Sequence, residues 1–420
     1  MANTIKLNNC KVYKDGTFVS ADVTLDGGNI SISQPALGGA FSNEQAKTLY
    51  VFPGFADVHV HLREPGFSYK ETMESGSSAA AHGGYTAVLT MPNLKPSPDS
   101  IEGAREQLAA IRRGASIAVI PYGTITKGSL GDELSDMEAI APMVAAFSDD
   151  GRGVQSEEMM LAAMQKAKSL GKMIVAHCED NSLLRGGYIH DGEYARAHGH
   201  RGICSESEWS PIARDVELLK RSGAAYHVCH VSTKESVEII RQAKAAGVNI
   251  TCETAPHYLT LDDSCLQEDG RFKMNPPLRA REDREALVAG LLDGTVDMIA
   301  TDHAPHSHEE KSRGLEDSMM GVVGLETAFP VIYTELVKPG IITLEQAVEL
   351  LSTRPRARFG IDSDVGFTVF DLGCEYTVDP EKFLSKGRST PYKGARVFGK
   401  CLATVYLGRA VYLDEDLIKI

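Results

Sequence analysis

Two histidines separated by one residue are the starting point for the chemistry of this chain. His59 and His61 follow an apolar run, residues 51–55, that predicts a buried strand. Side chains at positions i and i+2 of a strand point the same way. The two imidazoles therefore converge on one point, as ligands of a metal ion must. Arg63 follows with a guanidinium suited to binding a carboxylate. A His-x-His pair alone is equally compatible with two half-buried strand histidines, so its meaning depends on the rest of the chain.

Four further ionisable residues follow apolar runs in a repeating order of helix, glycine, strand and ionisable residue. His177, His230, Glu253 and Asp302 each occupy the last position of such a unit. Continuous apolar strands between helices are typical of a parallel sheet, and a (β/α)8 barrel carries its chemistry at the carboxyl ends of its strands. The chain lacks the Gly-x-Gly-x-x-Gly pattern of the alternative, a doubly wound open sheet. The predicted fold is therefore α/β, a TIM-like (β/α)8 barrel.

Another strand end lies at residues 145–151, where two aspartates precede Gly151. Alone, Asp-Asp-Gly is typical of a turn. In a barrel, an aspartate here joins the histidines and can bridge two cations directly, and the residues alone leave Asp149 and Asp150 open. Imidazole and carboxylate without thiolate suit Zn²⁺ or a similar ion in a catalytic role. The predicted metal ligands are His59, His61, Asp150 (or its neighbour), His177, His230 and Asp302.

Several polar residues in loops are candidates for holding a substrate beside the metal. Asn93 ends the second strand, Asn275 lies in a long loop after the seventh, and His306 follows Asp302 closely. Asparagine and histidine in loops are usually turn formers, so each candidate depends on its neighbours. The polar run at residues 307–321 predicts either a lid or a solvated loop.

The elements that position these residues fall into three stretches. Residues 1–50 contain two hairpin signals, Asp15-Gly16 and Asp26-Gly27-Gly28, and predict the first part of a β domain. Residues 51–355 predict the barrel. Residues 356–420 return to strands, expected at 365–372, 397–400 and 403–409, and predict the second part of the β domain. Because chain termini often lie close together, we expect both ends to form one small composite β domain.

Capping residues and glycines set the expected bounds of the first barrel elements. Helices are expected over residues 69–82, from a Ser100 cap through Arg113, and from a Ser156 cap to Leu170. Strands are expected over residues 85–91 and 117–120.

Composition excludes several classes of function. The 420 residues carry a formal net charge of −14, which argues against a nucleic-acid partner, since that requires a basic face. No apolar run reaches 18 residues, so no membrane span is expected. The N-terminus lacks the basic and apolar regions of a signal peptide. Eight scattered cysteines form no Cys-x-x-Cys pair, which predicts a reduced, cytoplasmic protein.

Taken together, these motifs make the chain resemble the long, class I dihydroorotases of the amidohydrolase superfamily. The resemblance covers nearly the whole chain, and several of its motifs are specific to this family. Many amidohydrolase barrels carry a carboxylated lysine on strand four, whereas this chain has no lysine there. The motifs are residues 52–63, 90–93, 148–151, 177–180, 230–232, 274–279 and 301–306.

The resemblance implies reversible conversion of dihydroorotate to N-carbamoyl-L-aspartate in pyrimidine synthesis. It implies one or two Zn²⁺ held by the predicted ligands, and a family spacing of 27 residues before His177 selects Asp150 over Asp149. Asp302 would also be the catalytic acid and base. The residues implied to lie against the substrate are His61, Arg63, Asn93, Asn275, His306, Met320 and Gly321.

Two departures and two alternatives accompany the resemblance. Family members often carry Phe where this chain has Met320, and Pro-His-His where it has Pro256-His257-Tyr258; both concern lid packing and rate. The first alternative is an allantoinase or dihydropyrimidinase, against which Arg63 argues, since their uncharged substrates need no carboxylate clamp. The second is a non-catalytic partner of aspartate transcarbamoylase, against which the full ligand set argues. A homo-oligomer such as a dimer, with possible association with that transferase, is also expected.

Overall fold

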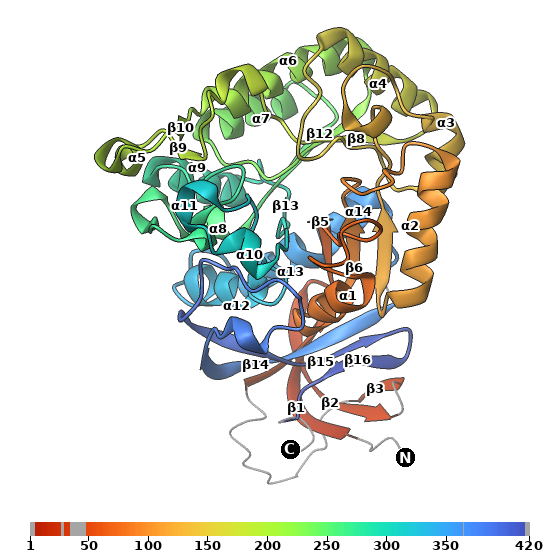
Figure 1. Ribbon diagram of the computed structural model, residues 1–420. Helices are drawn as coiled ribbons and strands as arrows, with labels where there is room; N and C mark the ends of the chain where they lie inside the picture. The colour runs from red at the N-terminus through yellow and green to blue at the C-terminus, as the bar shows by residue number, and fades with distance from the viewer. Residues whose placement is uncertain (1–4, 27–28, 34–47, 364, 416–420) are drawn as a thin grey trace.

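The computed structural model describes residues 5–26, 29–33, 48–363 and 365–415. In Figure 1, parallel strands surrounded by helices form the upper body, and a mostly antiparallel sheet lies below it. The strands are β1 (Ile5–Lys14), β2 (Thr17–Asp26), β3 (Asn29–Ser33), β4 (Leu49–Pro53), β5 (Phe55–Val60), β6 (Tyr85–Thr90), β7 (Ala118–Pro121), β8 (Met173–Ala176), β9 (Ile189–His190), β10 (Gly202–Ile203), β11 (Ala225–Val228), β12 (Ile250–Thr254), β13 (Met298–Ile299), β14 (Gly366–Thr377), β15 (Arg396–Tyr406) and β16 (Arg409–Leu413). The α-helices are α1 (Met73–His82), α2 (Ile101–Gly114), α3 (Met137–Ile140), α4 (Glu157–Ser169), α5 (Glu193–His198), α6 (Glu206–Ser222), α7 (Lys234–Ala245), α8 (Pro256–Thr260), α9 (Arg281–Asp293), α10 (His308–Lys311), α11 (Gly314–Asp317), α12 (Ala328–Ile332), α13 (Leu344–Val348) and α14 (Arg354–Phe359).

The parallel strands of the upper body pair in a continuous order. One sheet runs β5-β6-β7 and another β8-β11-β12-β13. Phe147 connects the two, since it bridges Gly123 beyond β7 and Ile174 in β8. His303, just beyond β13, bridges Val60 of β5, also in parallel. The pairings therefore return to the first strand, and the body is α/β with all carboxyl strand ends at one end.

Local signals explain where the first helices begin. The predicted caps are confirmed: Ser100 accepts a hydrogen bond from Gly103 N–H and Ser156 from Met159 N–H. Helix α1 differs from expectation, since it begins at Met73 and not at residue 69. The reason is a capping box at Thr72, whose hydroxyl binds Ser75 N–H while the Ser75 hydroxyl accepts from Thr72 N–H.

The strand expected over residues 51–55 is instead two strands that meet at Gly54. β4 pairs with β1 and β14 in the lower sheet, whereas β5 pairs with β6 in the upper body. A Cβ on Gly54 would lie 2.2 Å from side-chain atoms of Thr86, so only glycine fits this crossing. The chain thus passes between the two parts of the molecule five residues before His59.

The lower sheet is built from both ends of the chain. Its seven strands run β16-β15-β14-β4-β1-β2-β3, and β1 and β2 form the hairpin predicted at Asp15-Gly16. The second signal, at residues 26–28, joins the antiparallel pair β2 and β3, with Gly27 and Gly28 outside the described residues. The strand expected at 397–400 and most of the one expected at 403–409 form one strand, β15, which stays paired with β14 through two register shifts. The expected second strand runs too far, since β15 ends at Tyr406 and Arg409 already begins β16.

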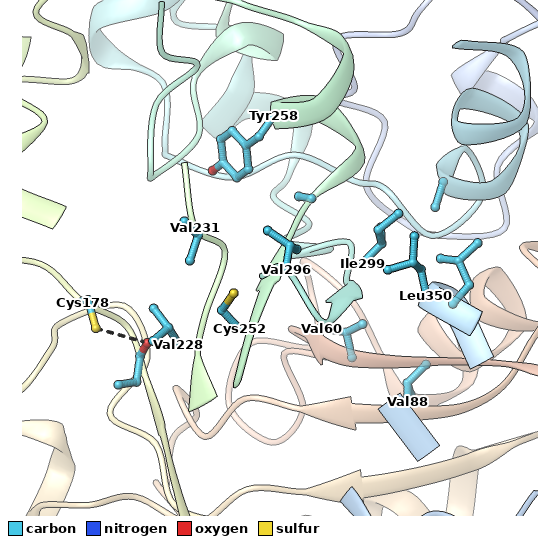
Figure 2. Packing of buried hydrophobic residues seen from close by; sticks show 14 of the residues in the cluster. Val60, Val88, Cys178, Val228, Val231, Cys252, Tyr258, Val296, Ile299 and Leu350 are labelled. Atoms are coloured by element: carbon cyan, nitrogen blue, oxygen red, sulfur yellow. Dashed lines mark hydrogen bonds between the residues drawn. The ribbon is translucent and has the colours of Figure 1, made fainter. Parts of the chain in front are cut away.

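Alternate residues of the upper strands pack on opposite sides. Val88 in β6 belongs to the largest apolar cluster, while its neighbours Ala87 and Leu89 belong to a second one. Figure 2 shows Val60, Val88 and other residues of the largest cluster, drawn from several strands and from the helical segment that carries Leu350. Strands buried on both faces explain why the sequence shows continuous apolar runs there.

The C-terminal part also contributes a loop to the upper body. The backbone N–H groups of Leu384 and Ser385 donate to Glu326, and the Ser385 hydroxyl donates to the buried carboxylate of Glu71. Val323 N–H in turn donates to Ser389 O. This loop therefore supports the segment that follows Asp302. Among the described residues, no helix combines the length and apolarity needed to cross a membrane.

Candidate active site

The six predicted metal ligands converge at the carboxyl ends of the parallel strands. Each is buried, with exposed fractions between 0 and 7 %. His59 lies in β5, His61 directly after it, Asp150 after the Phe147 bridge, His177 after β8, His230 after β11 and Asp302 after β13.

Asp150 lies at the centre of this cluster. Its Oδ1 is 3.4 Å from His59 Nε2, 3.5 Å from His177 Nδ1 and 3.6 Å from His230 Nε2. Its Oδ2 is 3.5 Å from His61 Nε2. Burial alone would raise the pKa of Asp150, but the surrounding imidazoles, His59 foremost, hold it well below its ordinary value. One carboxylate therefore faces ligands from both sides of the cluster.

Asp302 completes the side of the cluster that contains His59 and His61. Its Oδ1 is 3.0 Å from His61 Nε2 and 3.5 Å from His59 Nε2. Burial would raise the pKa of Asp302, but the two histidines bring it to about 2. The carboxylate is consequently ionised at neutral pH.

The structure separates the two aspartates that the sequence left open. Asp149 points away from the histidines and anchors a loop, accepting hydrogen bonds from Ile125 N–H at 2.8 Å and from the backbone and hydroxyl of Thr126. Asp150 alone contacts the cluster.

Outer hydrogen bonds orient the ligand histidines. His59 Nδ1 lies 2.6 Å from Glu253 Oε1, and His61 Nδ1 lies 3.0 Å from Asn93 Oδ1. Since carboxylate and amide oxygens only accept, each Nδ1 carries a proton, which leaves each Nε2 as the nitrogen that would bind a metal at the centre.

The backbone at the site is held in an uncommon conformation. Arg63, His230 and Asp302 have φ values of 51°, 35° and 48°. Non-glycine residues rarely adopt positive φ, and such residues cluster at functional sites. In each case the chain turns sharply just beyond its strand, which directs the side chain inward.

Three buried polar atoms of the predicted ligands lack a hydrogen bond within the described part of the chain: His59 Nε2, Asp150 Oδ1 and His177 Nε2. Unpartnered buried polar atoms are costly unless a ligand satisfies them. A divalent cation is a ligand that would satisfy such atoms. Two groupings here, His59 with His61 and Asp302, and His59 with Asp150 and His230, have donor atoms within 4.8 Å of one another. The donor set thus fits a metal ion of the zinc type.

Arg63 lies beside the cluster and is 8 % exposed. Its Nε donates to Pro305 O at 3.2 Å, and its Nη2 is 3.5 Å from His306 Nε2. Within the described residues, no carboxylate lies within 4.0 Å of its guanidinium, whereas the buried Arg279 has Glu208 Oε2 at 3.8 Å. A buried guanidinium without an anionic partner marks a place for an anionic ligand.

His306 is held between two cations. Lys70 Nζ lies 3.2 Å from its Nδ1, and its Nε2 lies 2.8 Å from Met320 O. Burial, together with Arg63 and Lys70, lowers the pKa of His306 to about 3. The ring is therefore neutral, with its proton on Nε2 donated to the Met320 carbonyl.

Asn275 and Gly321 lie on loops around the cluster. Asn275 Nδ2 donates to Glu179 Oε1 at 2.8 Å, and its Oδ1 is buried without a partner in the described chain. Gly321 has φ 132°, and a Cβ there would lie 2.8 Å from Ala304 O. The position therefore requires glycine, and its N–H donates to Lys273 O.

Sequence reasoning missed three residues that the structure places against the predicted ones. Glu253 contacts His59, Glu179 Oε2 is 3.5 Å from His177 Nε2, and Lys70 contacts His306. Glu253 carried a usable signal, since the sequence places it after an apolar run, as it does His177 and His230, although in the structure it lies within β12. Lys70 carried none, because its partner lies 236 residues away.

Comparison with known proteins gives consistent sequence matches. A family model described as Dihydro-orotase-like matches residues 48–236. A dihydroorotase from Shouchella clausii is 50 % identical over 413 residues, which is 96 % of either chain. A dihydroorotase from Fusobacterium nucleatum is 48 % identical and covers 99 % of this chain and 100 % of its own length.

Solved structures share the fold at lower identity. The L-hydantoinase (dihydropyrimidinase) of Arthrobacter aurescens superposes with a TM-score of 0.82 at 24 % identity, covering 97 % of this chain and 96 % of its own. The dihydropyrimidinase of Brevibacillus agri gives a TM-score of 0.80 at 22 % identity.

Proposed function

Since this chain belongs to the dihydroorotase family, we propose that its strand-end cluster opens the ring of dihydroorotate to N-carbamoyl-L-aspartate and catalyses the reverse closure. The reaction is hydrolysis of a cyclic amide. The observation that supports this substrate is Arg63, a buried guanidinium with no carboxylate of the described chain within 4.0 Å. Dihydroorotate carries a ring carboxylate, whereas hydantoins and dihydropyrimidines are uncharged, so Arg63 favours the acidic ring over the substrates of the structural neighbours.

The metal is proposed to be Zn²⁺, one or two per chain. His59, His61 and Asp302 would hold one ion and His177 and His230 a second, with Asp150 between them. When bound, such ions lower the pKa of water from about 15.7 to about 7 and polarise the amide carbonyl.

Asp302 is proposed as the catalytic acid and base. Its carboxylate is ionised at neutral pH, so it can accept the proton of the attacking water. It can then deliver that proton to the ring nitrogen as the amide bond breaks. Its strained backbone and its contact with His61 fix the oxygen that performs both transfers.

The remaining predicted residues are proposed to position the ring. Arg63 would bind the carboxylate and Asn93 would offer its Nδ2, since its Oδ1 is occupied by His61. Asn275 would accept a ring N–H through its unpartnered Oδ1. The resemblance implies that His306, 3.5 Å from Arg63, helps to hold the same carboxylate, which would then accept the Nε2 hydrogen bond now donated to Met320 O. The backbone at Met320 and Gly321 would approach the ring from the other side. Together these contacts would hold the ring amide in a fixed position relative to the attacking water and Asp302, which lowers the entropic cost of the reaction.

The finer architecture is also a proposal. The cyclic order of parallel pairings and the hydantoinase fold support a (β/α)8 barrel over residues 51–355, with residues 1–50 and 356–420 forming one β domain. Buried thiols such as Cys178 and Cys252 support a reduced, cytoplasmic setting. Self-association as a homo-oligomer, and association with aspartate transcarbamoylase, remain predictions from the resemblance, to be tested by analytical ultracentrifugation.

Turnover of three substrates tests the proposal. Purified protein is assayed with dihydroorotate, dihydrouracil and hydantoin, before and after removal of metal by a chelator. We expect chelator-sensitive turnover of dihydroorotate alone. Turnover of only the uncharged rings would contradict the role of Arg63, and metal-free protein without any turnover would support a scaffolding role instead.

A further inference from the structure

Glu253 lies beneath the candidate metal cluster and contacts two of its members. The residue is in β12 and is 1 % exposed. Its Oε1 accepts from His59 Nδ1 at 2.6 Å and from the backbone N–H of His230 at 3.4 Å. One carboxylate oxygen thus joins a ligand from each side of the cluster.

The second oxygen of Glu253 is held by another buried histidine. Glu253 Oε2 lies 3.0 Å from His227 Nε2, and His227 Nδ1 lies 2.9 Å from Thr251 Oγ1. His227 is fully buried and is not a predicted ligand. Because both oxygens are engaged, the carboxylate cannot rotate, and the direction of the His59 ring is set.

We propose that Glu253 is a positioning residue whose negative charge strengthens His59 as a metal ligand through the hydrogen bond from His59 Nδ1, with His227 locking Glu253 in place. The inference rests on the proposed metal-dependent function. A carboxylate behind a ligand imidazole raises its basicity, and loss of such an outer partner typically weakens metal binding about 10–100-fold.

The molecule supplies a matched pair that lacks any candidate metal ligand. Glu326 is 7 % exposed and lies 2.6 Å from His82 Nδ1, the same distance that separates Glu253 from His59. It also accepts from backbone N–H groups, at Leu384 and Ser385. Replacing either glutamate takes away the buried carboxylate that binds a histidine. Only at Glu253 is that histidine a predicted metal ligand.

The experiment compares Glu253→Gln with Glu326→Gln. A glutamine at 253 can keep both contacts, because its oxygen accepts from His59 while its amide donates to the opposite tautomer of His227. The variant therefore removes the charge and preserves the shape. Zn²⁺ affinity is measured by competition with a chromophoric chelator, and thermal unfolding of the metal-free proteins serves as the control for folding.

We expect Zn²⁺ affinity about 10–100-fold weaker in Glu253→Gln and unchanged in Glu326→Gln. The absorption spectrum of the cobalt-substituted protein should also change only in the first variant. Equal affinities in Glu253→Gln and wild type would overturn the inference while leaving the proposed function intact. Wild-type protein that binds no Zn²⁺ would instead overturn the proposed function itself.

Discussion

The two ends of the parallel strands contain the same kinds of buried polar groups, which differ in how many hydrogen-bond partners the protein gives them. At the amino ends, Arg356 is 4 % exposed and its guanidinium donates to Gly54 O, Thr86 Oγ1 and Asp362 O. At the carboxyl ends, the comparably buried Arg63 donates to a single protein oxygen, Pro305 O, among the described residues.

The paired histidines and glutamates repeat this contrast. His82 and Glu326, at the amino end of β6, form a pair whose carboxylate is fully engaged by protein donors. His59 and Glu253 form an equally short pair, yet the other nitrogen of His59 is buried without a partner in the described chain. Polar groups whose hydrogen bonds are complete stabilise the fold, whereas incomplete ones mark where a ligand belongs.

The largest expected effect is on catalysis at the carboxyl ends. Asp302→Asn should lower kcat roughly 10²–10⁴-fold, because the amide cannot carry the proton from water to the leaving nitrogen. Steady-state assays with dihydroorotate measure the loss, and circular dichroism checks that the fold remains. Turnover at the wild-type rate would exclude the proton-transfer role.

A substitution at the amino ends of the strands should lower stability and leave catalysis unchanged. Arg356→Met leaves the Gly54 carbonyl and the Thr86 hydroxyl without their donor, which should cost about 2–4 kcal/mol of unfolding free energy. Urea denaturation measures the cost. The kcat of the folded protein and its metal content should stay at wild-type values, and a loss of metal would break the distinction between the two ends.

The third effect concerns the substrate carboxylate. Arg63→Gln should reduce kcat/KM about 10–100-fold, chiefly through a higher KM, since a hydrogen bond to a charged group contributes roughly 1.5–3 kcal/mol. Arg63→Lys keeps the charge but not the planar guanidinium, so its kcat/KM should lie between those of wild type and Arg63→Gln. An unchanged KM in Arg63→Gln would remove the basis for preferring an acidic ring.

The smallest effect is a pH dependence of stability near the site. Lys311 Nζ donates to Lys273 O and Met319 O, and burial lowers the pKa of Lys311 to about 7. In the unfolded chain its pKa is about 10.4. Between these values the unfolded state binds a proton that the folded state lacks, so stability should rise with pH from 7 to 10, on the order of 1–2 kcal/mol.

Lys311→Met tests that dependence. Its unfolding free energy should lack the rise between pH 7 and pH 10, whatever its absolute stability. Chemical denaturation of both proteins at several pH values measures the two slopes, and parallel slopes would exclude Lys311 as the titrating group.

Residues that follow strong periodic signals could be predicted from the sequence. The caps Ser100 and Ser156, the parallel order of the body and the convergence of six ligand-type residues follow from strand ends and glycines, because a parallel sheet brings all carboxyl ends together. The split at Gly54 could not be predicted, since it depends on the distant side chain of Thr86. The residues alone also left Asp149 and Asp150 open, since Asp149 is bound by Thr126, 23 residues earlier; only the spacing implied by the resemblance selected Asp150.

The outer partners of the site escaped prediction for a related reason. Glu253 lies 194 residues from His59 and Lys70 lies 236 residues from His306. No local spacing rule connects such positions. Residue propensities also do not predict the positive φ values at Arg63, His230 and Asp302, because the surrounding structure imposes them.

Anomalous diffraction at the zinc absorption edge tests the central claim most directly. Crystals grown from active protein without chelator should show anomalous density between Asp150 and the four histidines, about 2.0–2.3 Å from the ligand atoms. One peak or two would settle how many ions the site holds. Active protein whose crystals show no anomalous density at this cluster, or show it only elsewhere, would contradict the account.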